Sequence, residues 1–185
     1  MYNINAIAIQ WYEPGQDREV AALSTCCLCG GFIFMKNDEY FMEIALQEAY
    51  QAFNEDEIPV GCVLVCEDKV VIKAHNSKNK DNDLFGHAEI NALKQLQKLN
   101  KNWRMNSYTM YVTLEPCPMC ASALQQARIN RIVFGAYDKK GGACGGLFDL
   151  FMNPGLNHYP FIHGGVKQEE CSFVLKEYFA KKRQK

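Results

Sequence analysis

The chain has no apolar stretch of about 18 residues, the length that a membrane-spanning helix needs. A basic start followed by an unbroken apolar run, as in a secretory leader, is also missing, and so are internal repeats and low-complexity tracts. We therefore expect a globular protein without a membrane span. The net charge of −1 argues against non-specific coating of nucleic acid, although it allows a local basic patch.

A disulfide framework is not expected either. The nine cysteines are odd in number, and Cys62 and Cys66 lie inside apolar runs, where free cysteine behaves as a small buried hydrophobe. Disulfide frameworks are typical of shorter secreted chains. The cysteines favour a reducing, cytoplasmic location.

With 185 residues, the chain is long enough for one domain and a small appendage. Residues 1–34 differ in pattern from the rest, and a new start is indicated at Met35, with Asn37 suited to cap a helix. We hypothesise that Met35 is the natural start, that residues 1–34 are an atypical extension that is not native, and that residues 35–185 form the functional domain. Mass spectrometry of protein from its native source tests this.

Strands and helices alternate along the rest of the chain. Helical periodicity predicts helices at residues 39–53, 87–99, 118–127 and 169–182. Apolar runs predict strands at residues 58–66, 70–74, 108–114, 131–136 and 161–166, the first two forming a hairpin. A glycine-rich loop is expected at residues 141–146 and one or two helical turns at residues 146–151. This alternation indicates a layered α/β fold.

Two motifs carry the chemistry: His87-Ala88-Glu89 and Pro116-Cys117-Pro118-Met119-Cys120. One imidazole and two thiolates can hold a tetrahedral zinc ion with its fourth position open. Cys117 and Cys120 lie at a predicted helix start, which stabilises thiolates. Glu89 is placed to move protons at the open position. We therefore predict that His87, Cys117 and Cys120 bind one Zn²⁺ per chain and that Glu89 is catalytic, a pattern typical of zinc-dependent nucleobase deaminases.

Each piece alone has a plainer interpretation. A single histidine near an apolar helix is usually a core or surface residue, and a single C-x-x-C pair is also typical of redox or structural zinc sites. The conjunction of both motifs favours the catalytic interpretation. A second C-x-x-C pair, Cys26 and Cys29 beside Cys27, has no further ligands nearby, which favours a chance match.

From Asn37 to Arg183 the chain resembles the bacterial tRNA-specific adenosine deaminases of the cytidine/deoxycytidylate deaminase superfamily. Besides the zinc motifs, the resemblance rests on these segments: Ile58-Pro59-Val60-Gly61, Asn76, Tyr111-Val112-Thr113-Leu114-Glu115, Val133-Phe134-Gly135-Ala136, residues 141–146, Asn157-His158 and Glu170-Cys171. It implies a three-layer fold whose central five-stranded mixed sheet is flanked by helices. It also implies a homodimer that converts the wobble adenosine of arginine tRNA to inosine, with the anticodon stem-loop contacting both subunits.

The resemblance assigns substrate contacts as well. Asn76 and the backbone N–H of Ala88 would bind the purine, Val60 would line the pocket, and Asn157 and His158 would contact flipped anticodon nucleotides. From the residues alone, Asn76 is also suited to shape a turn and Val60 to pack in the core.

RNA binding needs positive charge. We predict phosphate contacts from five cations, although a solvated helix end has the same composition. These are Lys139, Lys140, Lys181, Lys182 and Arg183.

The chain departs from the family at two places. Phe85-Gly86 stands where Thr or Ser followed by Ala is common, and Gly145-Gly146 replaces the usual Gly-Ser. Glycine is expected to loosen the helix start, and Phe85 leaves the substrate preference open.

Two other functions stay open. One is a zinc-dependent deaminase of a free base or nucleotide, such as guanine or cytosine, which assays of tRNA against free bases distinguish. The other is a zinc-stabilised RNA-binding module without catalysis, which needs a fourth protein ligand.

Overall fold

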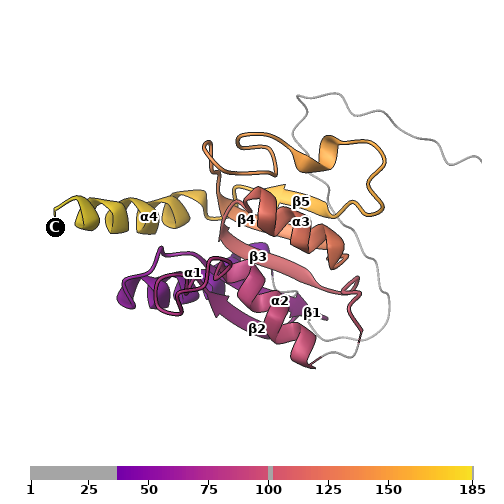
Figure 1. Cartoon of the computed structure of the whole chain (residues 1–185), viewed down its shortest axis with the longest axis horizontal. Coiled ribbons are helices and arrows are strands. Elements are labelled where there is room, and N and C mark those ends of the chain that lie inside the picture. The colour runs from indigo at the N-terminus through magenta and orange to yellow at the C-terminus, as the bar shows by residue number, and fades with distance from the viewer. Residues whose placement is uncertain (1–36, 100–101, 185) are drawn as a thin grey trace, which may run out of the picture. The chain divides into compact units, whose positions relative to one another are not determined.

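The computed structural model describes residues 37–99 and 102–184 (Figure 1). Met35, which we hypothesise to be the natural start, lies outside these residues, and so does the C-x-x-C pair in the extension. Helix α1 (Asp38–Asn54) begins where the sequence predicts a cap, because the side chain of Asn37 accepts a hydrogen bond from the backbone N–H of Tyr40 at 3.0 Å.

The five strands form one mixed sheet in the order β2-β1-β3-β4-β5, as expected. Strand β1 (Gly61–Cys66) is antiparallel to β2 (Lys69–His75) and to β3 (Thr109–Leu114). The two-residue turn between β1 and β2 has positive φ at both residues, the geometry that favours a tight hairpin. Strands β3, β4 (Arg131–Ala136) and β5 (Phe161–Gly164) run parallel.

Helices cover both faces of the sheet and complete the predicted three layers (Figure 1). Helices α1 and α4 (Gln168–Arg183) pack on one face, where alternate strand residues such as Val63, Tyr111 and Val133 are buried. Helices α2 (Ala88–Leu99) and α3 (Pro118–Gln126) cover the other face, over Leu64, Val112 and other strand residues. The sheet thus brings the starts of α2 and α3 to one side.

The connection from β4 to β5 differs in detail from the expectation. In place of one or two helical turns at residues 146–151, there is a single 3₁₀ turn, η1 (Leu150–Met152), capped by the Asp149 side chain. Strand β5 is also shorter than expected, and Gly165 follows it with a φ of 87° that does not continue a strand. None of the described helices has the length and apolar character that crossing a membrane requires.

Candidate active site

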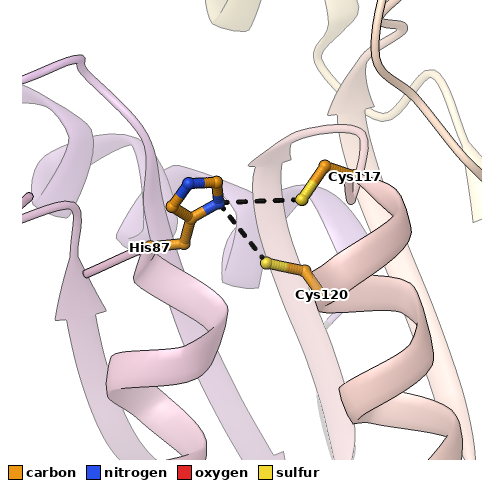
Figure 2. Close-up of side chains that lie close together, drawn as sticks. All are labelled: His87, Cys117 and Cys120. Carbon is orange, nitrogen blue, oxygen red and sulfur yellow. Dashed lines mark hydrogen bonds between the residues drawn. The ribbon is translucent and has the colours of Figure 1, made fainter. Parts of the chain in front are cut away.

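The three predicted metal ligands meet at the starts of α2 and α3 (Figure 2). His87 directly precedes α2, and its Nδ1 lies 3.7 Å from Cys117 Sγ and 3.5 Å from Cys120 Sγ. The three ligand atoms all lie within 4.8 Å of one another. In the described part of the chain, no fourth His, Cys, Asp or Glu side chain joins this group, which matches an open site.

The geometry fits a zinc ion. Tetrahedral angles and usual bond lengths of about 2.05 Å for Zn–N and about 2.3 Å for Zn–S place nitrogen and sulfur about 3.6 Å apart. The two observed nitrogen–sulfur distances bracket this value. One borderline nitrogen and two soft sulfur donors are also the chemistry that zinc prefers. The nitrogen–sulfur distances and the donor chemistry of His87, Cys117 and Cys120 therefore fit a zinc ion.

Local interactions favour the metal-binding form of Cys117. A hydrogen bond from the Cys120 thiol, with help from His87, lowers the pKa of Cys117 to about 4 despite its partial burial. The same hydrogen bond and burial raise the pKa of Cys120. The thiolate is the form that binds metals, so one sulfur of the pair is already prepared as a ligand.

Glu89 lies in the first turn of α2 and is only 4% exposed. Burial raises the pKa of its carboxyl group to about 7, and the Cys117 sulfur acts in the same direction. The Glu89 side chain also forms a hydrogen bond with Cys120. The carboxyl group is therefore in direct contact with the ligand set, where the motif predicts it.

Val60 and Asn76 lie side by side, Val60 just before β1 and Asn76 just after β2. The backbone N–H of Asn76 donates to the carbonyl of Val60 at 3.0 Å, and both residues are buried. Val60 and Ala88 belong to the same apolar cluster. The structure thus groups these three predicted pocket residues on the sheet face that carries the metal ligands.

Sequence reasoning missed Glu57, a fully buried carboxylate before β1. Its Oε2 accepts hydrogen bonds from Asn76 Nδ2 at 3.0 Å and from Asn79 Nδ2 at 3.2 Å, and its Oε1 accepts one from the backbone N–H of Lys80 at 2.6 Å. A glutamate beside other acidic residues is usually a solvated surface residue. The only local signal is its position next to a buried strand.

Gly86 closes the loop between Asn76 and His87. The backbone N–H of Ser77 donates to the carbonyl of Gly86 at 2.9 Å, and a Cβ at Gly86 would lie 3.0 Å from the Lys78 backbone. Glycine therefore allows the two ends of the loop to approach closely. Phe85, two residues before His87, is 53% exposed, so its ring is available at the surface.

Glu115 belongs to a segment that carries the family resemblance, but sequence reasoning gave it no role. Its carboxylate holds the glycine-rich loop against the segment that carries the cysteines. Glu115 is buried and accepts backbone N–H bonds from Asp138 at 2.9 Å and from Cys144 and Gly146 at 2.8 Å. The backbone N–H of Ala143 in turn donates to the carbonyl of Pro116 at 2.9 Å. These contacts fasten the loop to the residue that precedes Cys117.

The two predicted anticodon contacts are anchored beside α3. Asn157 Oδ1 accepts a hydrogen bond from Gln125 Nε2 at 2.8 Å, and its carbonyl accepts one from Arg128 at 2.8 Å. His158 Nε2 donates to the carbonyl of Ile129 at 2.6 Å. Asn157 is thus bonded to α3 itself, and both residues are bonded to the segment that follows this helix.

The five cations predicted to contact phosphate have different surroundings in the structure. Lys140 and Arg183 line a cavity of about 730 Å³, together with Tyr137 and Phe179. Lys182 Nζ is instead paired with Asp56 at 2.7 Å, and Lys181 Nζ lies over the Phe53 ring. Lys139 is exposed in the turn after β4.

The chain matches the family model described as the cytidine and deoxycytidylate deaminase zinc-binding region over residues 35–136. Together with the fold and the His/Cys/Cys group, this match shows that the chain belongs to the cytidine and deoxycytidylate deaminase family. It is 39% identical to the tRNA-specific adenosine deaminase of Bacillus subtilis over 151 residues, which are 82% of this chain and 94% of that relative.

Solved structures agree with this placement. A chain from a study of A-to-I editing by tRNA:A34 deaminases at the wobble position of transfer RNA superposes with a TM-score of 0.69 and 38% identity, covering 74% of this chain and 99% of that one. The guanine deaminase of Nitrosomonas europaea superposes with a TM-score of 0.64 at 21% identity, covering 77% and 84% of the two chains. The second likeness shows the fold alone.

Proposed function

We propose that this chain hydrolyses the wobble adenosine of a tRNA anticodon, that of arginine tRNA, to inosine and ammonia. The observation that carries the proposal is a three-ligand His/Cys/Cys group with the buried Glu89 in contact with it. Relatives named tRNA-specific adenosine deaminases, similar over most of the chain, support RNA as the substrate. We assign this activity to residues 35–185.

The ligand group and Glu89 divide the chemistry between them. A zinc ion held by His87, Cys117 and Cys120 supplies the Lewis acidity that makes water nucleophilic near neutral pH. Glu89 takes one proton from the attacking water and delivers it to the ring nitrogen, and it then carries the second proton from the new hydroxyl group to the departing amine. The carbon at position 6 gains oxygen and loses ammonia. Burial of Glu89 keeps bulk water away from these transfers.

The target adenine must flip out of the base stack to reach the His/Cys/Cys group. In this proposal Val60 lines the pocket, while Asn76 and the backbone N–H of Ala88 bind the purine. Asn157 and His158, anchored beside α3, contact neighbouring nucleotides. Phe85, exposed beside His87, is available to contact the nucleotide next to the target.

The basic cavity offers a path for the RNA strand. Lys140 and Arg183 supply charge and Phe179 supplies an aromatic face, the combination that single-stranded nucleic acid favours. The cavity also reaches Leu114, three residues before Cys117, so a strand bound there passes close to the metal ligands. Lys139 lies next to this path, and we include Lys181 and Lys182 as weaker contacts with phosphate. We further propose a homodimer that works in the cytoplasm.

Incubation of the zinc-loaded protein with transcribed arginine tRNA, followed by detection of inosine at the wobble position, tests the proposal. Guanine and cytosine are assayed in parallel through ammonia release. Inosine in tRNA without release from free bases supports the proposal. Ammonia from free bases alone would assign the chain to the alternative deaminase class, and zinc-dependent RNA binding without ammonia from any substrate would assign it to a binding module.

A further inference from the structure

We propose that Glu57 is a positioning residue that fixes the orientation of the Asn76 amide, and thereby the hydrogen-bonding pattern shown to the nucleobase. This inference rests on the proposed function, because it takes Asn76 as a contact to the purine. Glu57 is 0% exposed and Asn76 is 5% exposed. Glu57 precedes β1 and Asn76 follows β2, so both lie at the open end of the β1–β2 hairpin.

The hydrogen bonds of Glu57 all have the same direction. Both carboxylate oxygens accept from N–H groups of the loop that follows β2: two side-chain amides and the backbone of Lys80. An ionised carboxylate offers acceptors only. The amide of Asn76 must therefore turn its Nδ2 toward Glu57, at 3.0 Å, and its Oδ1 away from Glu57.

The orientation of this amide matters because its two ends are chemically opposite. The amide oxygen accepts and the amide nitrogen donates, so a half-turn of the side chain would invert the pattern offered to a base. Among the described residues, no hydrogen bond to Asn76 Oδ1 is found. The backbone N–H of Asn76 donates to the carbonyl of Val60. Glu57 thus leaves the oxygen and one N–H of Asn76 for a ligand.

The nearby Glu55 provides a matched comparison. Glu55 is two residues away and holds the same loop, with its Oε2 3.1 Å from Lys80 Nζ and 3.4 Å from His75 Nε2. Among the described residues, Glu55 forms no hydrogen bond or ion pair with Asn76, and it is exposed. A general loosening of the loop would follow from loss of either carboxylate, whereas loss of the amide orientation would follow from loss of Glu57 alone.

A double-mutant cycle tests the assignment. Glu57→Gln keeps the size of the side chain but replaces one acceptor oxygen with a donor, so either one N–H of the loop loses its acceptor or Asn76 turns over. Single-turnover inosine formation in an anticodon stem-loop is measured for the wild type, Glu57→Gln, Asn76→Ala and the double variant. Zinc content and Tm are measured for each protein.

We expect Glu57→Gln to slow the wild-type reaction about 10- to 100-fold with zinc content unchanged. In the Asn76→Ala background the same substitution should cost less than about twofold, because its effect passes through Asn76. Glu55→Gln should stay within about twofold of the wild type. If Glu57→Gln does not fold, Glu57→Asp, which keeps the charge and shortens its reach, takes its place in the cycle.

The outcomes separate the two proposals. Equal losses in both backgrounds, or a loss of zinc from Glu57→Gln, would overturn the positioning role and leave the proposed function standing. A wild-type chain that binds zinc but forms no inosine would overturn the proposed function, and the assignment of Glu57 with it.

Discussion

Gly142 lies so close to Glu115 that a Cβ atom at this position would overlap the Glu115 carboxylate. The carboxylate is held there by the backbone N–H groups of Asp138, Cys144 and Gly146, so it cannot move aside without losing these bonds. The absence of a side chain at Gly142 thus allows the Glu115 carboxylate to stay in place, two residues before Cys117.

Gly142→Ala is expected to lower the free energy of unfolding by about 1–3 kcal/mol, the usual cost of forcing an extra methyl group into a packed site. Urea unfolding of the zinc-free protein measures this. Gly141→Ala is the matched control, because its Cβ would meet only the tip of the Asp138 side chain, which can move. Equal stability of the two variants would show that Glu115 does not restrict this position.

Glu89→Ala should bind zinc as the wild type does and lose turnover by about 10²- to 10⁴-fold, the usual contribution of a general acid–base group. Although Glu89 contacts Cys120, the three ligands are carried by the starts of α2 and α3, so loss of the Glu89 carboxyl group leaves all three donor atoms. Metal analysis and inosine formation are measured on the same preparation. Full zinc content with surviving activity would remove Glu89 as the proton carrier.

Removal of one metal ligand should act differently. His87→Ala leaves only two sulfur donors, so zinc content should fall far below one ion per chain, and activity should fall with it. A metal analysis after dialysis measures the loss, and addition of a chelator to the wild type provides the comparison. Retention of one tightly bound zinc ion would place the metal elsewhere.

Asp38 should make stability depend on pH. Burial opposes its ionisation, but hydrogen bonds from Arg131, Tyr111 and His163 outweigh this and lower the pKa of Asp38. A carboxyl group whose pKa is lowered by folding stabilises the protein above its unfolded pKa of about 3.9, and this contribution is lost as the pH falls through the folded value.

The comparison is therefore between Asp38→Asn and the wild type from pH 6 downward. We expect the wild type to be more stable at pH 6 by on the order of 1–3 kcal/mol, the range for hydrogen bonds to charged groups. The difference should shrink below about pH 4. Asp81→Asn, at an exposed loop position, is the control. A difference that is independent of pH would show that ionisation of Asp38 does not stabilise the fold.

Cations in the basic cavity should contribute more to tRNA binding than cations that already form ion pairs within the protein. Lys140→Ala and Arg183→Ala are each expected to weaken tRNA binding and to reduce the slope of log K against log salt by about 1. Lys182→Ala should have a smaller effect, because Lys182 is already paired with Asp56. Binding at several salt concentrations measures the slopes, and equal slopes for all three variants would exclude the cavity as the RNA path.

Much of the fold was predictable because its signals are local. Helical periodicity and apolar runs placed all four α-helices and all five strands to within a few residues. The exception, residues 146–151, follows the glycine-rich loop and has no periodic pattern, and there the chain forms only a short 3₁₀ turn. The metal ligands were predictable for a similar reason, since zinc chemistry restricts both residue type and spacing.

Glu57 and Glu115 could not be found in this way. Each looks like a surface residue in its local segment, and its burial depends on N–H groups that lie 19 to 31 positions further along the chain. Local sequence also does not show which cations form ion pairs, since Asp56, the partner of Lys182, lies 126 positions away from it.

The amino-acid sequence alone determined which elements form, in which order, and which three side chains can bind zinc, because periodicity, spacing and donor chemistry act over short distances. The tertiary structure decided which carboxylates are buried, which way the Asn76 amide faces and which cations stay available. These properties depend on how the sheet and its helices bring distant segments together, and the cost of burying a charged or polar group is met only when those segments supply its hydrogen bonds.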